Sequence, residues 1–119
     1  MCKILIAEDD PLIRNLFKEI LKRKGYDIVE AVDGEDALIV YDKLQKKPDI
    51  IIVDFRMPKI NGLELTQEIL LRDPNSNIIM VTGDPTVNQE KIHDSGVIYR
   101  EKPVQMDEFL KVINTLAMI

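Results

Sequence analysis

Short apolar runs alternate with longer stretches along the chain, and the two kinds of segment differ in period. Five runs of five residues have the length and content of buried strands. These predicted strands are Lys3–Ala7, Asp27–Ala31, Asp49–Val53, Asn77–Val81 and Val97–Glu101. In the stretches between them apolar residues recur every three or four positions, as in Leu12, Ile13, Leu16 and Phe17, which is typical of amphipathic helices.

Capping residues mark where the predicted helices begin and end. Asp10 is expected to be an N-cap, with Pro11 at the first helical position. Gly25 is expected to end this helix. The five predicted helices run from Pro11 to Lys24, from Asp33 to the Lys46-Lys47-Pro48 terminator, from Leu63 to about Leu71, from Asp84-Pro85 to Ser95-Gly96, and from Asp107 to about Met118.

Strands that alternate with helices through short connections predict a doubly wound α/β fold. We expect a five-stranded parallel sheet with helices on both faces and right-handed crossovers. Asp49–Val53 is apolar on both faces and is expected at the centre, whereas the less apolar Val97–Glu101 is expected at an edge. Since no linker or low-complexity tract interrupts the pattern, residues 1–119 are expected to form one domain.

Polar side chains follow four of the predicted strands. Glu8 and Asp9 come after the first, Asp54 after the third, Thr82 after the fourth and Lys102 after the fifth. In open parallel sheets ligands bind beyond the carboxyl ends of the strands. These five residues are therefore the candidate site.

Three converging carboxylates cannot all stay ionised without compensation. Mg²⁺, with Mn²⁺ as an alternative, would supply it through one or two carboxylates, a backbone carbonyl and waters. A phosphoryl group at Asp54 would complete the metal's shell while the Asp54 carboxylate attacks in line. The Lys102 ammonium and the Thr82 hydroxyl suit the other phosphoryl oxygens.

Each residue alone also has a structural interpretation. Asp9 or Asp10 could simply cap a helix, and Asp54 could hold a loop through backbone N–H groups. Thr82 could be an ordinary strand-end hydroxyl and Lys102 a solvated cation. Independent caps do not explain acids, a hydroxyl and a lysine on one rim, so the joint arrangement favours a functional site.

The motifs on this rim resemble the receiver domains of two-component response regulators, the CheY-like family with the flavodoxin-like fold. The resemblance covers essentially the whole chain and implies a (βα)5 domain with strand order 2-1-3-4-5. The matching stretches are Ile4-Leu5-Ile6-Ala7-Glu8-Asp9-Asp10, Ile51-Ile52-Val53-Asp54-Phe55-Arg56-Met57-Pro58 with Gly62, Val81-Thr82-Gly83 and Lys102-Pro103.

The resemblance implies a role for each site residue. Asp54 would accept a phosphoryl group from a phosphohistidine on a sensor histidine kinase or phosphotransfer protein. Glu8, Asp9, Asp54 and the Arg56 carbonyl would bind Mg²⁺. Thr82 and Lys102 would bind the phosphoryl group. Such a domain catalyses only its own phosphorylation and dephosphorylation and is not otherwise an enzyme.

The resemblance also implies how phosphorylation would change the surface of the protein. Thr82 and Tyr99 would form a switch that remodels the surface made by the helix after Asp84, the strand Val97–Glu101 and the last helix. That surface would bind a downstream protein or a second copy of the chain. Tyr99 could equally be an ordinary edge-strand tyrosine. The Lys102–Pro103 peptide bond is expected to be cis.

The chain departs from the family beside the site. Gly83 stands where the family often has alanine, which leaves the mouth of the site wide. Arg56 and Asp84 occupy the two positions that the family uses to set phosphoryl lifetime, and we hypothesise that they pair over the site and slow attack by water. Two solvated side chains are the alternative. The segment between Thr82 and Lys102 is slightly short, which leaves the register of Tyr99 open.

Composition narrows the choice of partner and compartment. The net charge of −5 argues against direct nucleic-acid binding, and no apolar run is long enough to span a membrane. The single Cys2 and single His93 give neither an intramolecular disulfide nor a zinc cluster. We expect a cytoplasmic protein with protein partners.

Two other functions need residues that this chain lacks, and a third remains open. A dehalogenase-type phosphohydrolase needs an acid two residues after its nucleophilic aspartate, where this chain has Arg56. A nucleotide-binding fold needs a glycine-rich loop after the first strand, where this chain has Glu8-Asp9-Asp10. A receiver-like module that binds proteins without being phosphorylated remains open, although no acid, acceptor or lysine is missing.

Overall fold

The computed structural model describes residues 2–83 and 97–118. They form five strands and four helices, and the expected fourth helix falls on residues 84–96, outside the described residues. The elements are β1 Lys3–Ala7, α1 Pro11–Arg23, β2 Asp27–Ala31, α2 Gly34–Lys43, β3 Ile50–Asp54, α3 Gly62–Arg72, β4 Ile78–Thr82, β5 Ile98–Glu101 and α5 Met106–Ala117.

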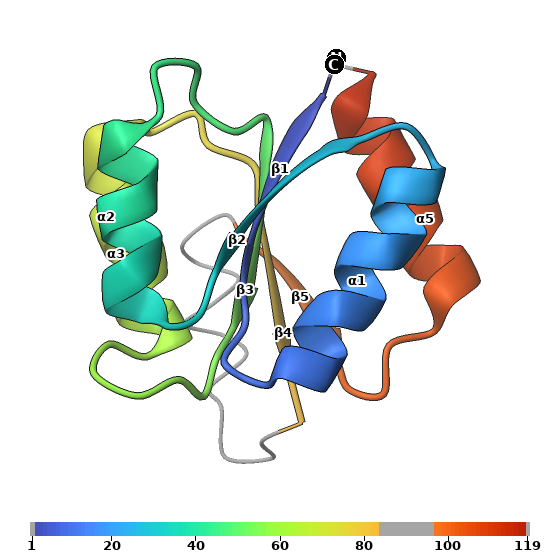
Figure 1. The fold of residues 1–119 in the computed structure, drawn as a ribbon, viewed down its shortest axis with the longest axis horizontal. Helices are drawn as coiled ribbons and strands as arrows, with labels where there is room; N and C mark the ends of the chain where they lie inside the picture. The colour runs from blue at the N-terminus through green and yellow to red at the C-terminus, as the bar shows by residue number, and fades with distance from the viewer. Residues whose placement is uncertain (1, 84–96, 119) are drawn as a thin grey trace.

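All five strands are parallel, in the order β2-β1-β3-β4-β5. The predicted fold class and strand order are therefore confirmed. β3 lies at the centre with every residue buried, and β5 is a partly exposed edge strand, also as predicted. In Figure 1 the helices α1 and α5 cover one face of the sheet, and α2 and α3 cover the other.

Alternation along the strands divides the core between these two faces. Ile4 and Ile6 of β1 pack in one cluster with residues of α1 and α5, whereas Leu5 and Ala7 pack in a second cluster with residues of α2 and α3. The other strands alternate in the same way because successive side chains of a strand point to opposite faces. Phe17 of α1 stacks on the α5 side with Phe109, their ring centroids 5.4 Å apart.

The starts of α1 and α2 follow the predicted caps, whereas α3 and α5 each begin one residue before the predicted start, at Gly62 and Met106. The side chain of Asp10 accepts a hydrogen bond from the N–H of Leu12, and that of Asp33 accepts from the N–H of Asp36. Asn61 and Glu64 form a reciprocal capping box at α3. Each cap satisfies backbone donors that a helix start leaves without partners.

The end of α2 differs from the prediction, since the helix stops at Lys43 and not at the Lys46-Lys47-Pro48 terminator. Lys47 folds back, so that its ammonium donates to the carbonyl of Tyr41 at 2.6 Å and lies 4.7 Å from the centre of that ring. This contact gives a carbonyl of the last turn a second donor beside the Leu44 N–H, at the point where the chain leaves the helix. No helix in the two described ranges has the length and apolar content needed to cross a bilayer.

Candidate functional site

The register of the sheet brings the first and third strands' acids together. Ala7 of β1 pairs with Val53 of β3, so one more step along both strands places Glu8 beside Asp54. Both follow residues that point toward α2 and α3, so alternation sends the side chains of Glu8 and Asp54 to the opposite side, toward α1 and α5. Asp54 is the last residue of β3 and Thr82 the last of β4, so both strands end one residue later than predicted.

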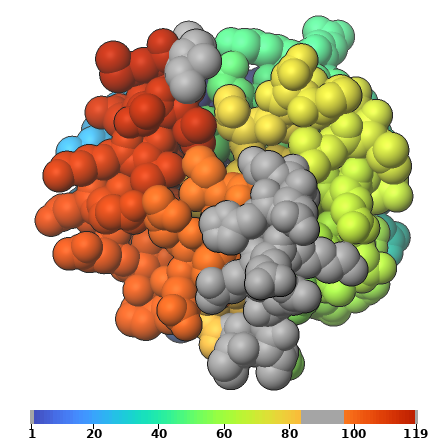
Figure 2. All heavy atoms as spheres, turned by 180° about the vertical axis from the view of Figure 1, so that it is seen from behind, coloured from blue at the N-terminus to red at the C-terminus, as the bar shows by residue number. Residues whose placement is uncertain are grey.

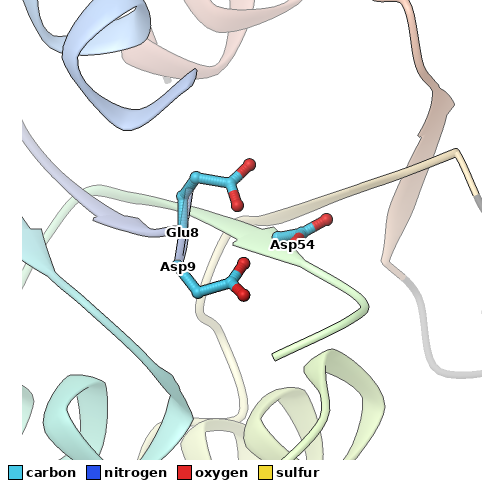
Figure 3. Close-up of side chains that lie close together, drawn as sticks. All are labelled: Glu8, Asp9 and Asp54. Carbon is cyan, nitrogen blue, oxygen red and sulfur yellow. The ribbon is translucent and has the colours of Figure 1, made fainter. Parts of the chain in front are cut away.

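Three carboxylates meet at this end of the sheet. Glu8, Asp9 and Asp54 each offer an oxygen within 4.8 Å of the other two. Figure 3 shows the Glu8 and Asp9 side chains leaving adjacent positions and extending toward Asp54. Glu8 and Asp54 are buried, at 2% and 5% exposure, whereas Asp9 is exposed. The predicted acid cluster is therefore present, with one acid open to solvent.

Lys102 supplies a positive charge to the two buried acids. Its Nζ lies 2.9 Å from Oε1 of Glu8 and 3.1 Å from Oδ1 of Asp54. Its backbone N–H donates to the carbonyl of Thr82 at 2.8 Å, which fixes the start of this loop against β4. The Lys102–Pro103 peptide bond is cis, as expected.

One lysine does not fully offset two buried carboxylates. Burial raises the pKa of Glu8 to about 7, although the hydrogen bond from Lys102 opposes the rise. Burial also raises the pKa of Asp54, again against the charge of Lys102. Burial would lower the pKa of Lys102, but Glu8 and Asp54 outweigh it and the net direction is upward. The site therefore holds excess negative charge.

This donor set fits a hard divalent cation. All three side-chain donors are carboxylate oxygens, which such cations prefer, and the exposed Asp9 leaves the cluster open to solvent. A cation would also offset the charge that Lys102 leaves uncompensated. The cluster can therefore bind a metal ion.

Thr82 and Tyr99 occupy the opposite side of the sheet from Lys102. Tyr99 pairs with Met80 in the β4–β5 register and packs against the core cluster that contains Met80. Thr82 lies two residues beyond Met80, so alternation gives it the same side. Tyr99 is partly buried. The two predicted switch residues therefore share one face on neighbouring strands.

The predicted gating residues are only partly described. Arg56 is exposed in the loop between β3 and α3, and Gly83 is exposed directly after β4. Among the described residues, a methyl group added at Gly83 would meet the Cβ of Lys102, at 3.6 Å. Asp84 lies outside the described residues, so its pairing with Arg56 remains a prediction.

One contact in the site was not predicted. Arg14 of α1 donates from Nη1 to the backbone carbonyl of Glu8 at 2.8 Å. The sequence offers only a weak signal for it, a basic residue one turn after the Asp10 cap. Nothing in the periodicity distinguishes this arginine from the solvated basic residues of α1.

An apolar hollow of about 420 Å³ adjoins Lys102 on the α1 side of the sheet. It is lined by α1 and by the segment that joins β5 to α5: Ile13, Leu16, Phe17, Lys102, Pro103, Val104 and Met106. Leu16, one of the lining residues, is exposed, and so is Leu12 one turn earlier in α1. Lys102 therefore connects the acid cluster to an apolar surface.

Comparison with known proteins agrees with this geometry. Residues 4–114 match the family described as response regulator receiver domain. The chemotaxis protein CheY of Listeria monocytogenes is 32% identical over 98% of this chain and 99% of its own length. The sporulation initiation phosphotransferase F of Bacillus subtilis is 31% identical over 89% of this chain and 86% of its own.

Solved structures give the same result. The response regulator TrrA of Thermotoga maritima, in complex with Mg²⁺-BeF, has a TM-score of 0.86 and 32% identity, covering 98% of this chain and 99% of that one. A receiver domain from Francisella has a TM-score of 0.87 and 28% identity, covering 99% of this chain and 98% of that one. The chain belongs to the response regulator receiver domain family.

Proposed function

We propose that Asp54 accepts a phosphoryl group from a phosphohistidine on a sensor histidine kinase or a histidine phosphotransfer protein. The observation that carries the proposal is the contact of Lys102 with both Glu8 and Asp54 at the open end of β3. This arrangement keeps an acceptor carboxylate buried yet reachable, with a cation beside it. A receiver is a signalling domain, and this one would catalyse only its own phosphorylation and dephosphorylation.

The metal of this site is proposed to be Mg²⁺, with Mn²⁺ as an alternative. Glu8, Asp9, Asp54 and the Arg56 carbonyl would hold it. When bound, the ion would neutralise charge on the transferring phosphoryl group. The description of TrrA as a complex with Mg²⁺-BeF supports this choice.

The chain's own groups would position the transfer. An oxygen of Asp54 would form the new O–P bond in line with the P–N bond that breaks, and the donor imidazole would leave with its electron pair. Lys102 would move its ammonium from the Glu8 and Asp54 oxygens to a phosphoryl oxygen, and Thr82 would bind a further one. The product is an acyl phosphate on Asp54.

Phosphorylation by a small donor tests this proposal. Acetyl phosphate with Mg²⁺ should label the wild-type protein, and Asp54→Asn should abolish labelling because an amide is a poor nucleophile. Intact-mass spectrometry would detect the added phosphoryl group. Persistent labelling of the Asn variant would contradict the acceptor assignment, whereas a folded wild type that never labels would favour the alternative of a binding module that is not phosphorylated.

The signal is proposed to leave through the β5–α5 side of the molecule. Thr82 and Tyr99 share a face on neighbouring strands, so a movement of Thr82 toward the phosphoryl group could draw Tyr99 inward. Figure 2 shows β5 and α5 forming one continuous surface, across which Arg100 pairs with Glu108 at 2.8 Å. With the helix expected after Asp84, this surface would bind a downstream protein or a second copy of the chain. We take residues 1–119 as one receiver domain.

Phosphoryl lifetime is proposed to depend on Arg56, Gly83 and Asp84. An ion pair between Arg56 and Asp84 would cover the mouth that Gly83 leaves wide. Arg56→Ala and Asp84→Ala should each shorten the lifetime of the acyl phosphate severalfold, because water reaches it more easily. Loss of label after removal of acetyl phosphate measures this, and unchanged rates in both variants would exclude the gate.

A further inference from the structure

Arg14 is held at the junction of α1, β1 and β2, close to the acid cluster. It lies one turn after the Asp10 cap, and its side chain is only 17% exposed. Its Nη1 donates to the carbonyl of Glu8 at 2.8 Å. A charge-assisted bond of this length is among the stronger hydrogen bonds in a protein, particularly when it is largely shielded from water.

A second contact fixes the guanidinium from the other side. Its Nε lies 3.4 Å from Oε1 of Glu30 on β2, and Lys18 of α1 lies 3.6 Å from the other oxygen of that carboxylate. Because the guanidinium of Arg14 is planar and contacts both groups, its orientation is set by Glu8, directly after β1, and by Glu30 of β2. Lys18 also pairs with Glu30. Among the described contacts it donates to no backbone atom of Glu8, Asp9 or Asp10.

The carbonyl that Arg14 holds belongs to the peptide between Glu8 and Asp9. The N–H of Glu8 donates to the carbonyl of Ala31, which continues the β1–β2 ladder, and the N–H of Asp10 donates to the Glu8 side chain. Rotation of the Glu8–Asp9 peptide would redirect the Asp9 side chain. These two bonds hold the peptides on either side, and Arg14 holds the Glu8–Asp9 peptide itself through its carbonyl.

We propose that Arg14 is a positioning residue for the acid pair, holding the Glu8–Asp9 peptide so that both carboxylates face Asp54. This inference rests on the proposed binding of Mg²⁺. The direction of the change in Mg²⁺ affinity distinguishes positioning by Arg14 from a simple charge effect. Removing a cation near an acidic cluster should strengthen cation binding by Coulomb's law, whereas loss of positioning should weaken it.

The experiment is a titration with Mg²⁺ alone, without any phosphodonor. The dissociation constant would be measured by following backbone amide shifts near the cluster, well below the unfolding temperature of each protein. Arg14→Ala should bind Mg²⁺ about tenfold more weakly than wild type, the order expected when support behind a metal ligand is lost. Lys18→Ala removes a cation from the same helix and the same Glu30, and should bind Mg²⁺ as tightly as wild type or slightly more tightly.

A conservative variant separates positioning from general destabilisation. Arg14→Lys keeps the charge but cannot reach the Glu8 carbonyl and Glu30 together in the same planar geometry, so its affinity should fall between those of Arg14→Ala and wild type. If Arg14→Ala unfolds, Arg14→Lys and Arg14→Gln carry the test.

The possible results separate this inference from the proposed function. Equal or tighter Mg²⁺ binding by folded Arg14 variants, with a normal wild type, would overturn the positioning role alone. Equal weakening in Lys18→Ala would overturn it too, since that variant leaves the Glu8 carbonyl contact in place. A wild type that binds no Mg²⁺ would remove the metal site and this inference with it.

Discussion

At the scale of single residues, the site shows two buried carboxylates sharing one lysine. Lys102 contacts Glu8 and Asp54 at similar distances, so its single positive charge offsets the charge of either carboxylate but not of both. The raised pKa of Glu8 follows from this shortage of positive charge, after burial itself. A bound cation would relieve the shortage and free Lys102 for a phosphoryl oxygen.

The Glu8 carboxyl should make stability depend on pH in a specific direction. Its pKa rises on folding from 4.5 to about 7, so in this interval the folded state holds the proton more tightly than the unfolded state. This group's contribution to the free energy of unfolding should therefore fall as pH rises, by at most about 1.4 kcal/mol per pH unit.

Urea unfolding of wild type and Glu8→Gln without divalent cations, at several pH values in that interval, measures this contribution as the difference between the two proteins. The Gln variant cannot ionise at this position, so wild type should lose stability relative to it with rising pH. A difference that stays constant, or that grows in favour of wild type, would contradict the assigned shift.

The sequence predicted where these residues lie but not which of them form ion pairs. Glu8, Asp54, Thr82 and Lys102 could be placed on one rim because the ends of parallel strands share an edge. The contact of Lys102 with both acids depends on how one long side chain folds across the rim, and periodicity carries no information about that. The bond from Arg14 was missed for the same reason.

At the scale of elements, the loop between β3 and α3 is pinned at two points. A side chain at Gly34, the first residue of α2, would lie 2.5 Å from the carbonyl oxygen of Ile60, and one at Gly62 would lie 2.5 Å from that of Asp54. Lys59, directly before Ile60, has a left-handed backbone (φ 72°), and its ammonium lies 3.5 Å from Asp33. The loop that carries Arg56 is thus fixed to the start of α2 as well as to β3.

Gly34→Ala should destabilise the protein by about 1–3 kcal/mol, because the added methyl group must displace backbone. Gly83→Ala is the matched control, since within the described part of the chain its methyl group would make an ordinary contact with Lys102, and it should change stability by less than about 1 kcal/mol. Urea unfolding of both variants decides this. Similar stabilities for the two would show that the α2 contact does not constrain the loop.

Element types were predictable because the apolar periods of strands and helices differ clearly in this chain. The early end of α2 was not, since it lies where Lys47 folds back onto Tyr41 and not at a helix-breaking residue. The contact between Gly34 and Ile60 joins distant segments, so no local pattern could reveal it. Local chemistry sets the caps, whereas tertiary contacts set the remaining boundaries.

At the scale of the whole molecule, the acid cluster opens beside an apolar surface of α1. Lys102 belongs both to the cluster and to the lining of the hollow, so a protein that delivers a phosphoryl group to Asp54 must approach near this surface. Leu12 is 81% exposed and Leu16 53% exposed. We expect the phosphodonor protein to cover them.

Leu12→Asp should slow phosphotransfer from a phosphorylated kinase that labels wild type by at least about tenfold, the loss expected for one apolar anchor. Labelling by acetyl phosphate should be unchanged, because a small donor needs no docking surface. Leu71→Asp, at a leucine of α3 that is 78% exposed, should affect neither reaction. If Leu12→Asp receives the phosphoryl group from the kinase at the wild-type rate, the donor does not use this surface.

The alternation of side chains across the sheet has a consequence for how such a protein can evolve. Glu8, Asp54 and Lys102 lie with α1, whereas Tyr99 and, by alternation, Thr82 lie on the other side. Under the proposed function, substitutions at exposed positions of α1 would change which donor is accepted while leaving the proposed switch residues Thr82 and Tyr99 untouched. The choice of donor and the switch would then diverge separately, so that one fold could be recruited into many signalling circuits.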